Sequence, residues 1–239
     1  MFGYYYGFDL TYLVIVLPCL ILAMIASANV NSTFKRYSKV GSMRRISGAQ
    51  AAQRVLSANG VSVVRIERIS GNLTDHFDPK TNVIRLSDSV YDSTSVAAIG
   101  VACHEAGHAV QYAQHYAPIK LRAAIIPITN IVSQLAMQMI FMGLLLNLGE
   151  NVSYGFVYAG IACFSLSLVF QLVTLPVEFN ASRRAMNAIA DGDILTDEEQ
   201  KGARKTLTAA AMTYVAATAV ALAQLLRLVL LFGGRRRRD

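Results

Sequence analysis

The stretch His104-Glu105-Ala106-Gly107-His108 is the segment around which this chain is organised. It matches H-E-x-x-H, the pattern of zinc hydrolases. On a helix, His104 and His108 lie one turn apart on one face, where two imidazoles can bind the same Zn²⁺ ion. Glu105 does not share this ligand face, but it can take a proton from the attacking water and pass it to a leaving amine. The pattern therefore indicates peptide-bond hydrolysis.

The residues around the motif are typical of a helix. Val96 to Tyr116 contains no proline and has alanine at many positions, and Thr94 or Ser95 stands where an N-cap is expected. Because only three positions of the motif are fixed, a chance match in a chain of this size arises on the order of once in a hundred. The alternative is a helix whose two histidines form hydrogen bonds inside a bundle.

A catalytic zinc usually takes three protein ligands, so a third must be found. His115 follows on the same expected helix, but a continuous helix carries it about two turns past His108. The known spacing with three histidines needs a glycine turn, whereas this chain has Gln111 and Gln114 in those places. We interpret His115 as an interfacial residue or a partner of the ligands.

Glu178 is the better candidate for the third ligand. It opens the polar stretch EFNASRRA at residues 178–185, which follows Pro176 directly after a long apolar segment. The alternative is a glutamate in the first turn of a helix, where the helix dipole favours a negative charge.

Three stretches together carry a family resemblance: HEAGH at 104–108, PVEFNASRRA at 176–185 and the segment from Asp75 to Ser87. Over most of its length the chain resembles the YugP family of bacterial membrane zinc metallopeptidases, and more distantly the HtpX and Ste24 proteases. The resemblance implies a gluzincin in which His104, His108 and Glu178 bind Zn²⁺ and Glu105 is the general base.

The chain departs from the HtpX and Ste24 pattern at Ser182. That pattern has an aspartate four residues after the glutamate ligand, where it can orient a histidine ligand. A serine can accept a hydrogen bond from an imidazole N–H but brings no charge. The basicity of the ligand and the identity of the orienting group therefore remain open at this position.

The composition is that of a membrane protein. Hydrophobic residues make up 54% of the chain and mean hydropathy is +0.41, values that a soluble domain of this size seldom reaches. Four apolar segments are long enough to cross a hydrocarbon core of about 30 Å. They are Leu10 to Ala28, Ala123 to Leu148, Tyr154 to Leu175 and Leu207 to Phe232.

The first apolar segment has a second interpretation as a cleaved signal, because Ala26-Ser27-Ala28 resembles a cleavage site. However, nothing before the segment is basic, and the Tyr4-Tyr5-Tyr6 cluster suits a membrane interface. We therefore expect a retained transmembrane helix.

The expected fold is a mainly α-helical membrane protein with about four transmembrane helices and a small α+β, zincin-like juxtamembrane catalytic module. Residues 1–28 form the first transmembrane segment and residues 29–116 the module with the HEAGH helix. Residues 117–239 supply three further apolar helices, with the EFNAS ligand helix between the third and fourth spans.

Within the module, Ser47 to Asn59 reads as an amphipathic helix ended by Gly60. Val61 to Ile69 and Val83 to Ser87 read as strands. Asn82 to Ser87 is our candidate for an edge strand that holds a peptide substrate as an added strand, with an ordinary hairpin as the alternative. His76, in a polar loop, is either a hydrogen-bond donor to the transition state or a histidine that caps local backbone.

Basic residues indicate the orientation, because they collect on the cytoplasmic side of short loops. They follow the first span, precede the second and lie between the third and fourth, whereas the turn at 149–153 has none. The residues are Lys35, Arg36, Lys39, Arg44, Arg45, Lys120, Arg122, Arg183, Arg184, Lys201, Arg204 and Lys205. Both ligand segments are therefore expected on the cytoplasmic side.

Arg235 to Arg238 contradict this orientation. An even number of spans would place them on the outer side, together with the N-terminus. Either the upstream charges override the tail, or the last apolar segment, with Arg227 near its end, is re-entrant or peripheral. The net charge of +7 is concentrated near membrane ends, so we interpret it as topology and lipid contact rather than nucleic-acid binding.

The sequence as a whole predicts a zinc metalloendopeptidase in the bacterial cell membrane, multi-pass, with its active site on the cytoplasmic side. Its expected partners are the lipid bilayer and a protein or peptide substrate, and not nucleic acid. An intramembrane protease would need a second motif with an aspartate inside a span, which the apolar segments lack. The remaining alternative is a non-catalytic, zinc-stabilised membrane scaffold or binding protein.

Overall fold

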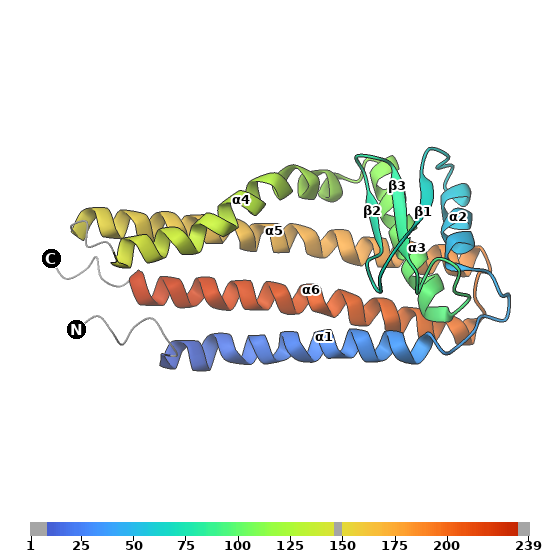
Figure 1. Cartoon of the computed structure of the whole chain (residues 1–239), viewed down its shortest axis with the longest axis horizontal. Helices are drawn as coiled ribbons and strands as arrows, with labels where there is room; N and C mark the ends of the chain where they lie inside the picture. Colours follow the sequence, from blue (N-terminus) through green and yellow to red (C-terminus); the bar gives the residue numbers. More distant parts are fainter. Residues whose placement is uncertain (1–8, 146–149, 234–239) are drawn as a thin grey trace. The chain divides into compact units, whose positions relative to one another are not determined.

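The computed structural model describes residues 9–145 and 150–233 of the 239-residue chain. These residues are mainly helical, with one small sheet (Figure 1). The elements in chain order are a π-helical turn η1 (Tyr12–Val16), α1 (Leu17–Tyr37), α2 (Gly48–Ala58), β1 (Arg65–Ile69), β2 (His76–Asp78), β3 (Val83–Ser87), α3 (Val96–Ala113), α4 (Ala117–Leu145), α5 (Glu150–Asp191) and α6 (Asp197–Phe232). The Tyr4-Tyr5-Tyr6 cluster, the first residue of the turn at 149–153 and the run Arg235 to Arg238 lie outside the described residues.

The described residues form two compact units. The first comprises those within Met1–Ile25, Leu121–Thr174 and Tyr214–Asp239, and the second Ala26–Lys120 and Leu175–Thr213. The sheet, α2 and α3 belong wholly to the second unit, whereas α1, α4, α5 and α6 contribute residues to both.

Four helices of the described chain are long and apolar enough to cross a membrane, as the sequence predicted. They are Tyr12–Tyr37, Ala117–Leu145, Asn151–Asp191 and Asp197–Phe232. Three of them extend well beyond the apolar segments: the first continues to Tyr37, the third passes through Pro176, and the last begins ten residues before Leu207. The polar ends extend these helices because side-chain polarity does not interrupt the backbone hydrogen bonds along the axis.

Within the first unit, Arg227 pairs with Asp9. The guanidinium Nη2 lies 3.1 Å from Asp9 Oδ2, and the two side chains are only 11% and 14% exposed. Asp9 Oδ1 also accepts a hydrogen bond from the Tyr12 backbone, and the guanidinium lies over the Tyr12 ring. The helix α6 runs unbroken past Arg227 to Phe232, so the paired charge is accommodated without a re-entrant turn.

In the second unit, the three strands have the order β1-β3-β2. β3 pairs in parallel with β1, from Arg65↔Val83 to Ile69↔Ser87, and antiparallel with β2. The expected strand Val83 to Ser87 is confirmed, but its expected position at an edge is wrong, because β3 is the central strand. Its residues are largely buried, whereas the charged β1 and the three-residue β2 form the edges, as is usual for exposed strands. The alternative of a hairpin describes the β2-β3 pair.

The two faces of the sheet differ in character. Ile66, Phe77, Ile84 and Leu86 belong to an apolar core shared with α2 and α3. The helix α2 packs on α3 and β1, and α3 packs on β2 and β3 (Figure 1). This packing places the HEAGH helix directly against the edge strand β2.

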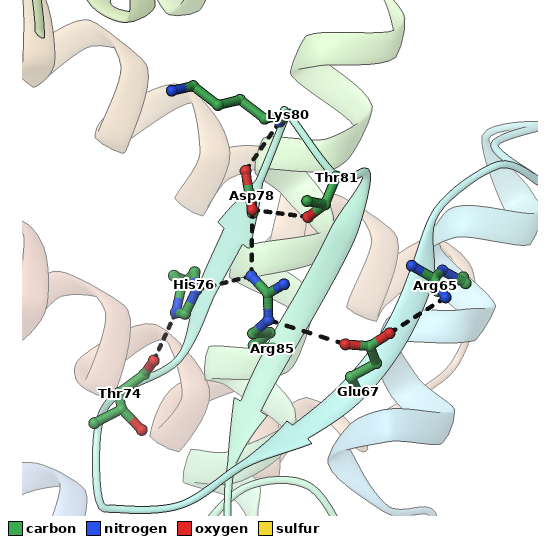
Figure 2. A network of polar contacts seen from close by, with 8 residues as sticks. All are labelled: Arg65, Glu67, Thr74, His76, Asp78, Lys80, Thr81 and Arg85. Atoms are coloured by element: carbon green, nitrogen blue, oxygen red, sulfur yellow. Dashed lines mark hydrogen bonds and ion pairs between the residues drawn. The ribbon is translucent and has the colours of Figure 1, made fainter. Parts of the chain in front are cut away.

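The opposite face carries a polar network centred on Arg85, which Figure 2 shows in close view. Arg85 lies 3.3 Å from Asp78 on β2 and 3.9 Å from Glu67 on β1, so it connects all three strands. His76 belongs to this face, and its Nδ1 is 2.9 Å from the carbonyl oxygen of Thr74. This contact supports the expectation that His76 binds local backbone.

The helix ends follow local sequence signals. Ser47 and Gln50 form a capping box at the start of α2, and Gly60 follows its end with a φ of +69°. At α6, the Thr196 backbone N–H donates to Glu199, and the Glu199 backbone N–H donates to the Thr196 hydroxyl. The observed helix α2, with Ser47 as its N-cap and Asn59 as its C-cap, confirms the predicted amphipathic helix from Ser47 to Asn59.

Candidate functional site

The HEAGH motif lies in the middle of α3. The helix begins after Ser95, whose hydroxyl accepts a hydrogen bond from the Ala98 backbone N–H at 3.2 Å. It ends at Ala113 rather than continuing to Tyr116, because His115 adopts a left-handed conformation with a φ of +56°. His115 is exposed and does not belong to the candidate metal-ligand group of the described chain.

Glu178 lies in the interior of α5, so its interpretation as a first-turn residue is wrong. The helix begins at Glu150 and continues to Asp191. Pro176 is accommodated within it, although proline has no N–H to donate to the Leu172 carbonyl. Glu178 therefore owes its position to the packing of α5 against α3 rather than to a helix terminus.

The structure brings the three expected ligands together. Oε2 of Glu178 lies 3.3 Å from Nε2 of His104 and 3.5 Å from Nε2 of His108. Candidate ligand atoms of all three residues lie within 4.8 Å of one another, and Glu178 is only 2% exposed. Two ligand atoms of a tetrahedral zinc site, each about 2.05 Å from the metal, are about 3.3 Å apart. Two imidazoles and a carboxylate at these distances therefore fit Zn²⁺.

Gly107 of the motif permits this approach of the two helices. A β-carbon at position 107 would lie 2.8 Å from the carbonyl oxygen of Ala181, closer than real β-carbons come. Ala181 is one turn after Glu178 on α5, and Gly107 is adjacent to His108. The contact between the backbones at Gly107 and Ala181 thus sets how close the Glu178 carboxylate comes to His104 and His108.

Each histidine has an oxygen next to its other ring nitrogen. Ser182 Oγ lies 3.1 Å from Nδ1 of His104, and Gln111 Oε1 lies 3.0 Å from Nδ1 of His108. If each Nδ1 carries the proton and donates it, each Nε2 presents a lone pair toward Glu178, as metal binding requires.

The sequence left open which group orients this histidine, and the structure places the Ser182 hydroxyl beside His104. The contact of Gln111 was missed. Its spacing of three residues after His108 placed it on the same helix face and could have indicated it.

Glu105 and Glu178 have opposite pKa shifts. Burial raises the pKa of Glu105 to about 7; the charges of Glu178 and Asp75 add to this rise, whereas the charge of His104 and a hydrogen bond from the Phe77 backbone oppose it. Burial also acts to raise the pKa of Glu178, but His104 and His108, when they are protonated on Nε2, outweigh it and hold that pKa well below its usual range. A carboxyl group with a pKa near 7 can both accept and donate a proton at neutral pH.

The edge strand β2 lies beside Glu105. The backbone N–H of Phe77 lies close enough to the Glu105 carboxylate to oppose the rise in its pKa, and the Phe77 ring contacts that of Tyr112 on α3, with a centroid distance of 6.0 Å. The Phe77 backbone therefore provides a polar group at the candidate site. Arg183, which adjoins Ser182, is exposed.

Two comparisons with known proteins agree with this geometry. Residues 12–233 match the family model described as "Putative neutral zinc metallopeptidase". The chain is also 42% identical over 221 residues to "Putative membrane protease YugP" of Bacillus subtilis (strain 168), which covers 92% of this chain and 96% of that protein. No solved structure matches the chain. The resemblance to the YugP family is confirmed, and the chain belongs to the family of neutral zinc metallopeptidases.

Proposed function

We propose that the protein is a membrane-bound zinc metalloendopeptidase, in which His104, His108 and Glu178 hold Zn²⁺ and Glu105 is the general base. The observation that carries the proposal is the convergence of two imidazole nitrogens on one carboxylate oxygen, at 3.3 and 3.5 Å. When bound, Zn²⁺ polarises the scissile carbonyl and makes the attacking water more acidic.

Glu105 moves the proton in this proposal. Its carboxylate accepts a proton from the water as the water attacks the peptide carbonyl, and then delivers it to the departing nitrogen. Burial, which raises its pKa, favours the protonated carboxyl group that delivers this proton. Because Glu105 is only 9% exposed, the proton remains with the reacting groups rather than exchanging with bulk water.

The edge of β2 is the place where we expect an extended substrate to bind. β2 is hydrogen-bonded to β3 on one side, and the Phe77 backbone on β2 contacts Glu105. A peptide that adds to the outer edge of this strand passes beside Glu105. Binding through backbone groups selects extended or unfolded segments rather than a particular folded partner.

The proposed location is the cytoplasmic face of the bacterial cell membrane. The four membrane-length helices and the name of the relative support a membrane protein, and the distribution of basic residues supports the side. Residues 1–28 would insert first, residues 29–116 would form the catalytic module, and residues 117–239 would add three helices, including the segment that carries Glu178.

Zinc content of ligand variants tests the proposal. We expect stoichiometric zinc in the detergent-purified wild type, and loss of zinc in His104→Ala, His108→Ala and Glu178→Gln, because each change removes one of three ligands. His115→Ala is the matched control, and it should keep its zinc. A wild type without zinc, or ligand variants that retain it with wild-type affinity, would contradict the ligand assignment.

A further inference from the structure

A chain of hydrogen bonds connects His108 to the surface through α5. Gln111, which is 0% exposed, lies 3.0 Å from His108 Nδ1 through its Oε1. Its Nε2 donates to the Val177 carbonyl oxygen and to Asn180 Oδ1, both at 2.9 Å. Asn180 Oδ1 also accepts a hydrogen bond from Nε of Arg184 at 2.7 Å. All these residues belong to the second unit.

The two ends of this chain fix the direction of every bond in it. A backbone carbonyl can only accept a hydrogen bond and a guanidinium can only donate one. The Gln111 atom that faces Val177 must therefore be nitrogen, and the Asn180 atom that faces Arg184 must be oxygen. With its nitrogen so placed, Gln111 presents its oxygen to His108.

The direction of these bonds selects one tautomer of His108. An amide oxygen cannot donate, so Nδ1 of the neutral imidazole must carry the proton. Nε2 is then left with the lone pair, and it points toward Glu178 at 3.5 Å. A rotated Gln111 amide would instead favour a proton on Nε2, where it would block metal binding.

We propose that Gln111, Asn180 and Arg184 are positioning residues that hold His108 in the tautomer and ring orientation needed to bind the metal. This inference rests on the proposed zinc site. Arg184 is itself held by Gln114, whose Oε1 accepts from Nη1 at 2.6 Å. Gln114 caps the C-terminal end of α3, so the end of the motif helix holds Arg184, the outermost member of the hydrogen-bond chain.

His104 is held differently, and the contrast makes the inference specific. Its Nδ1 faces the Ser182 hydroxyl at 3.1 Å, and a hydroxyl can either donate or accept. Ser182 alone therefore permits both tautomers of His104, whereas Gln111 permits one of His108. The loss of the hydrogen-bond chain should affect metal affinity even though none of its members is a ligand.

The test is the zinc dissociation constant of the full chain in detergent, measured by competition with a chromophoric chelator. Gln111→Met should weaken zinc binding about 10- to 100-fold, and Asn180→Leu and Arg184→Met should weaken it by less, because they act through Gln111. Asn180→Asp should restore near-wild-type affinity, since a carboxylate oxygen can accept from both Gln111 and Arg184. Asn187→Leu, two turns further along α5 at an exposed position, is the matched control.

Two further readouts separate positioning from a general structural role. The Co²⁺-substituted protein should show an altered visible spectrum in Gln111→Met and an unaltered one in Asn187→Leu. Melting temperatures of the metal-free variants show whether the fold is intact. Two results would overturn the positioning role and leave the proposed zinc site standing. They are equal zinc affinities for wild type and a folded Gln111→Met, and a zinc affinity of Asn180→Asp as weak as that of Asn180→Leu. A wild type that binds no zinc would overturn both proposals.

Discussion

Gly107 and Ala181 are so close that a β-carbon at position 107 would lie 2.8 Å from the Ala181 carbonyl oxygen. The motif helix α3 and the helix α5 can approach this closely only because residue 107 has no side chain. The third expected ligand, Glu178, lies one turn from Ala181. The glycine of HEAGH thus has a packing role between two segments that are about seventy residues apart in the sequence.

Gly107→Ala should therefore separate Glu178 from the histidines. We expect a loss of zinc affinity of at least tenfold and a matching loss of hydrolysis, because the new methyl group forces the backbones apart by a few tenths of an ångström or more. Gly100→Ala is the control on the same helix: its β-carbon would meet that of Ala203 at 3.4 Å, an ordinary contact. That variant should keep wild-type affinity, and equal behaviour of the two would contradict the packing role.

The contact between Ser182 and His104 leads to a second prediction. Ser182→Ala removes the oxygen that lies 3.1 Å from Nδ1 of His104 and should weaken zinc binding about tenfold. Ser182→Asp should bind zinc at least as tightly as wild type, because a carboxylate raises the basicity of the imidazole. Calorimetric titration of both variants with zinc would show the order, and a Ser182→Ala protein with unchanged affinity would exclude the orienting role.

The pair of Asp9 and Arg227 should stabilise the first unit. Because both side chains are largely buried, Arg227→Met leaves a carboxylate without its charged partner and should cost about 3 kcal/mol. The double variant Asp9→Asn, Arg227→Met should lose less than the sum of the two single changes. Denaturant titration in detergent micelles measures the coupling, and additive losses would show that the pair contributes nothing.

Asp75 should make stability depend on pH. Burial raises its pKa, and hydrogen bonds from the backbone N–H and hydroxyl of Ser87 offset only part of this rise. The folded chain therefore favours the protonated form. This contribution to stability is fully present below the usual pKa of about 4 and is lost as pH rises through the folded value.

Asp75→Asn tests this dependence, since it keeps an oxygen for the Ser87 N–H but cannot ionise. Its melting temperature relative to the parent should rise between pH 4 and neutrality. Both proteins should carry Glu105→Gln, so that only Asp75 titrates differently. A constant difference across this range would show that Asp75 keeps its ordinary pKa.

The elements predicted correctly from sequence are those set by local signals. The motif helix begins after Ser95, and α2 begins after Ser47, because each serine accepts a hydrogen bond from a backbone N–H in the first turn. Glu178 was proposed as a ligand from the resemblance and the polar stretch around it, and the structure places it beside both histidines. Its distance to the histidines was not predictable, because it depends on a contact between α3 and α5.

The errors concern features set by distant contacts. β1 pairs in parallel with β3, although β2 lies between them in the sequence. Nothing in the neighbouring residues therefore indicates that β3 is central. β2 was missed because its three residues are too few to show a pattern of alternation. Pro176 suggested a helix boundary, yet α5 continues through it, since one missing hydrogen bond does not end a 42-residue helix.

The role of Gln111 shows the same limit. In the sequence it is a polar residue near the end of a helix, and it served only to exclude the known spacing with three histidines. Its contacts with Val177 and Asn180 join residues more than sixty positions apart. Only the packed structure shows that the amide faces a candidate ligand.

The central claim is that Glu105 transfers the proton during zinc-dependent peptide hydrolysis. The most direct measurement is the cleavage rate of an unfolded reporter protein by detergent-purified wild type and Glu105→Gln, with bound zinc quantified in both. We predict that wild type cleaves and that Glu105→Gln retains zinc but does not cleave, because a neutral amide cannot accept the proton. Bound zinc without cleavage by either protein would favour a zinc-stabilised scaffold. A Glu105→Gln variant that cleaves as fast as wild type, with the same zinc dependence, would contradict the claim.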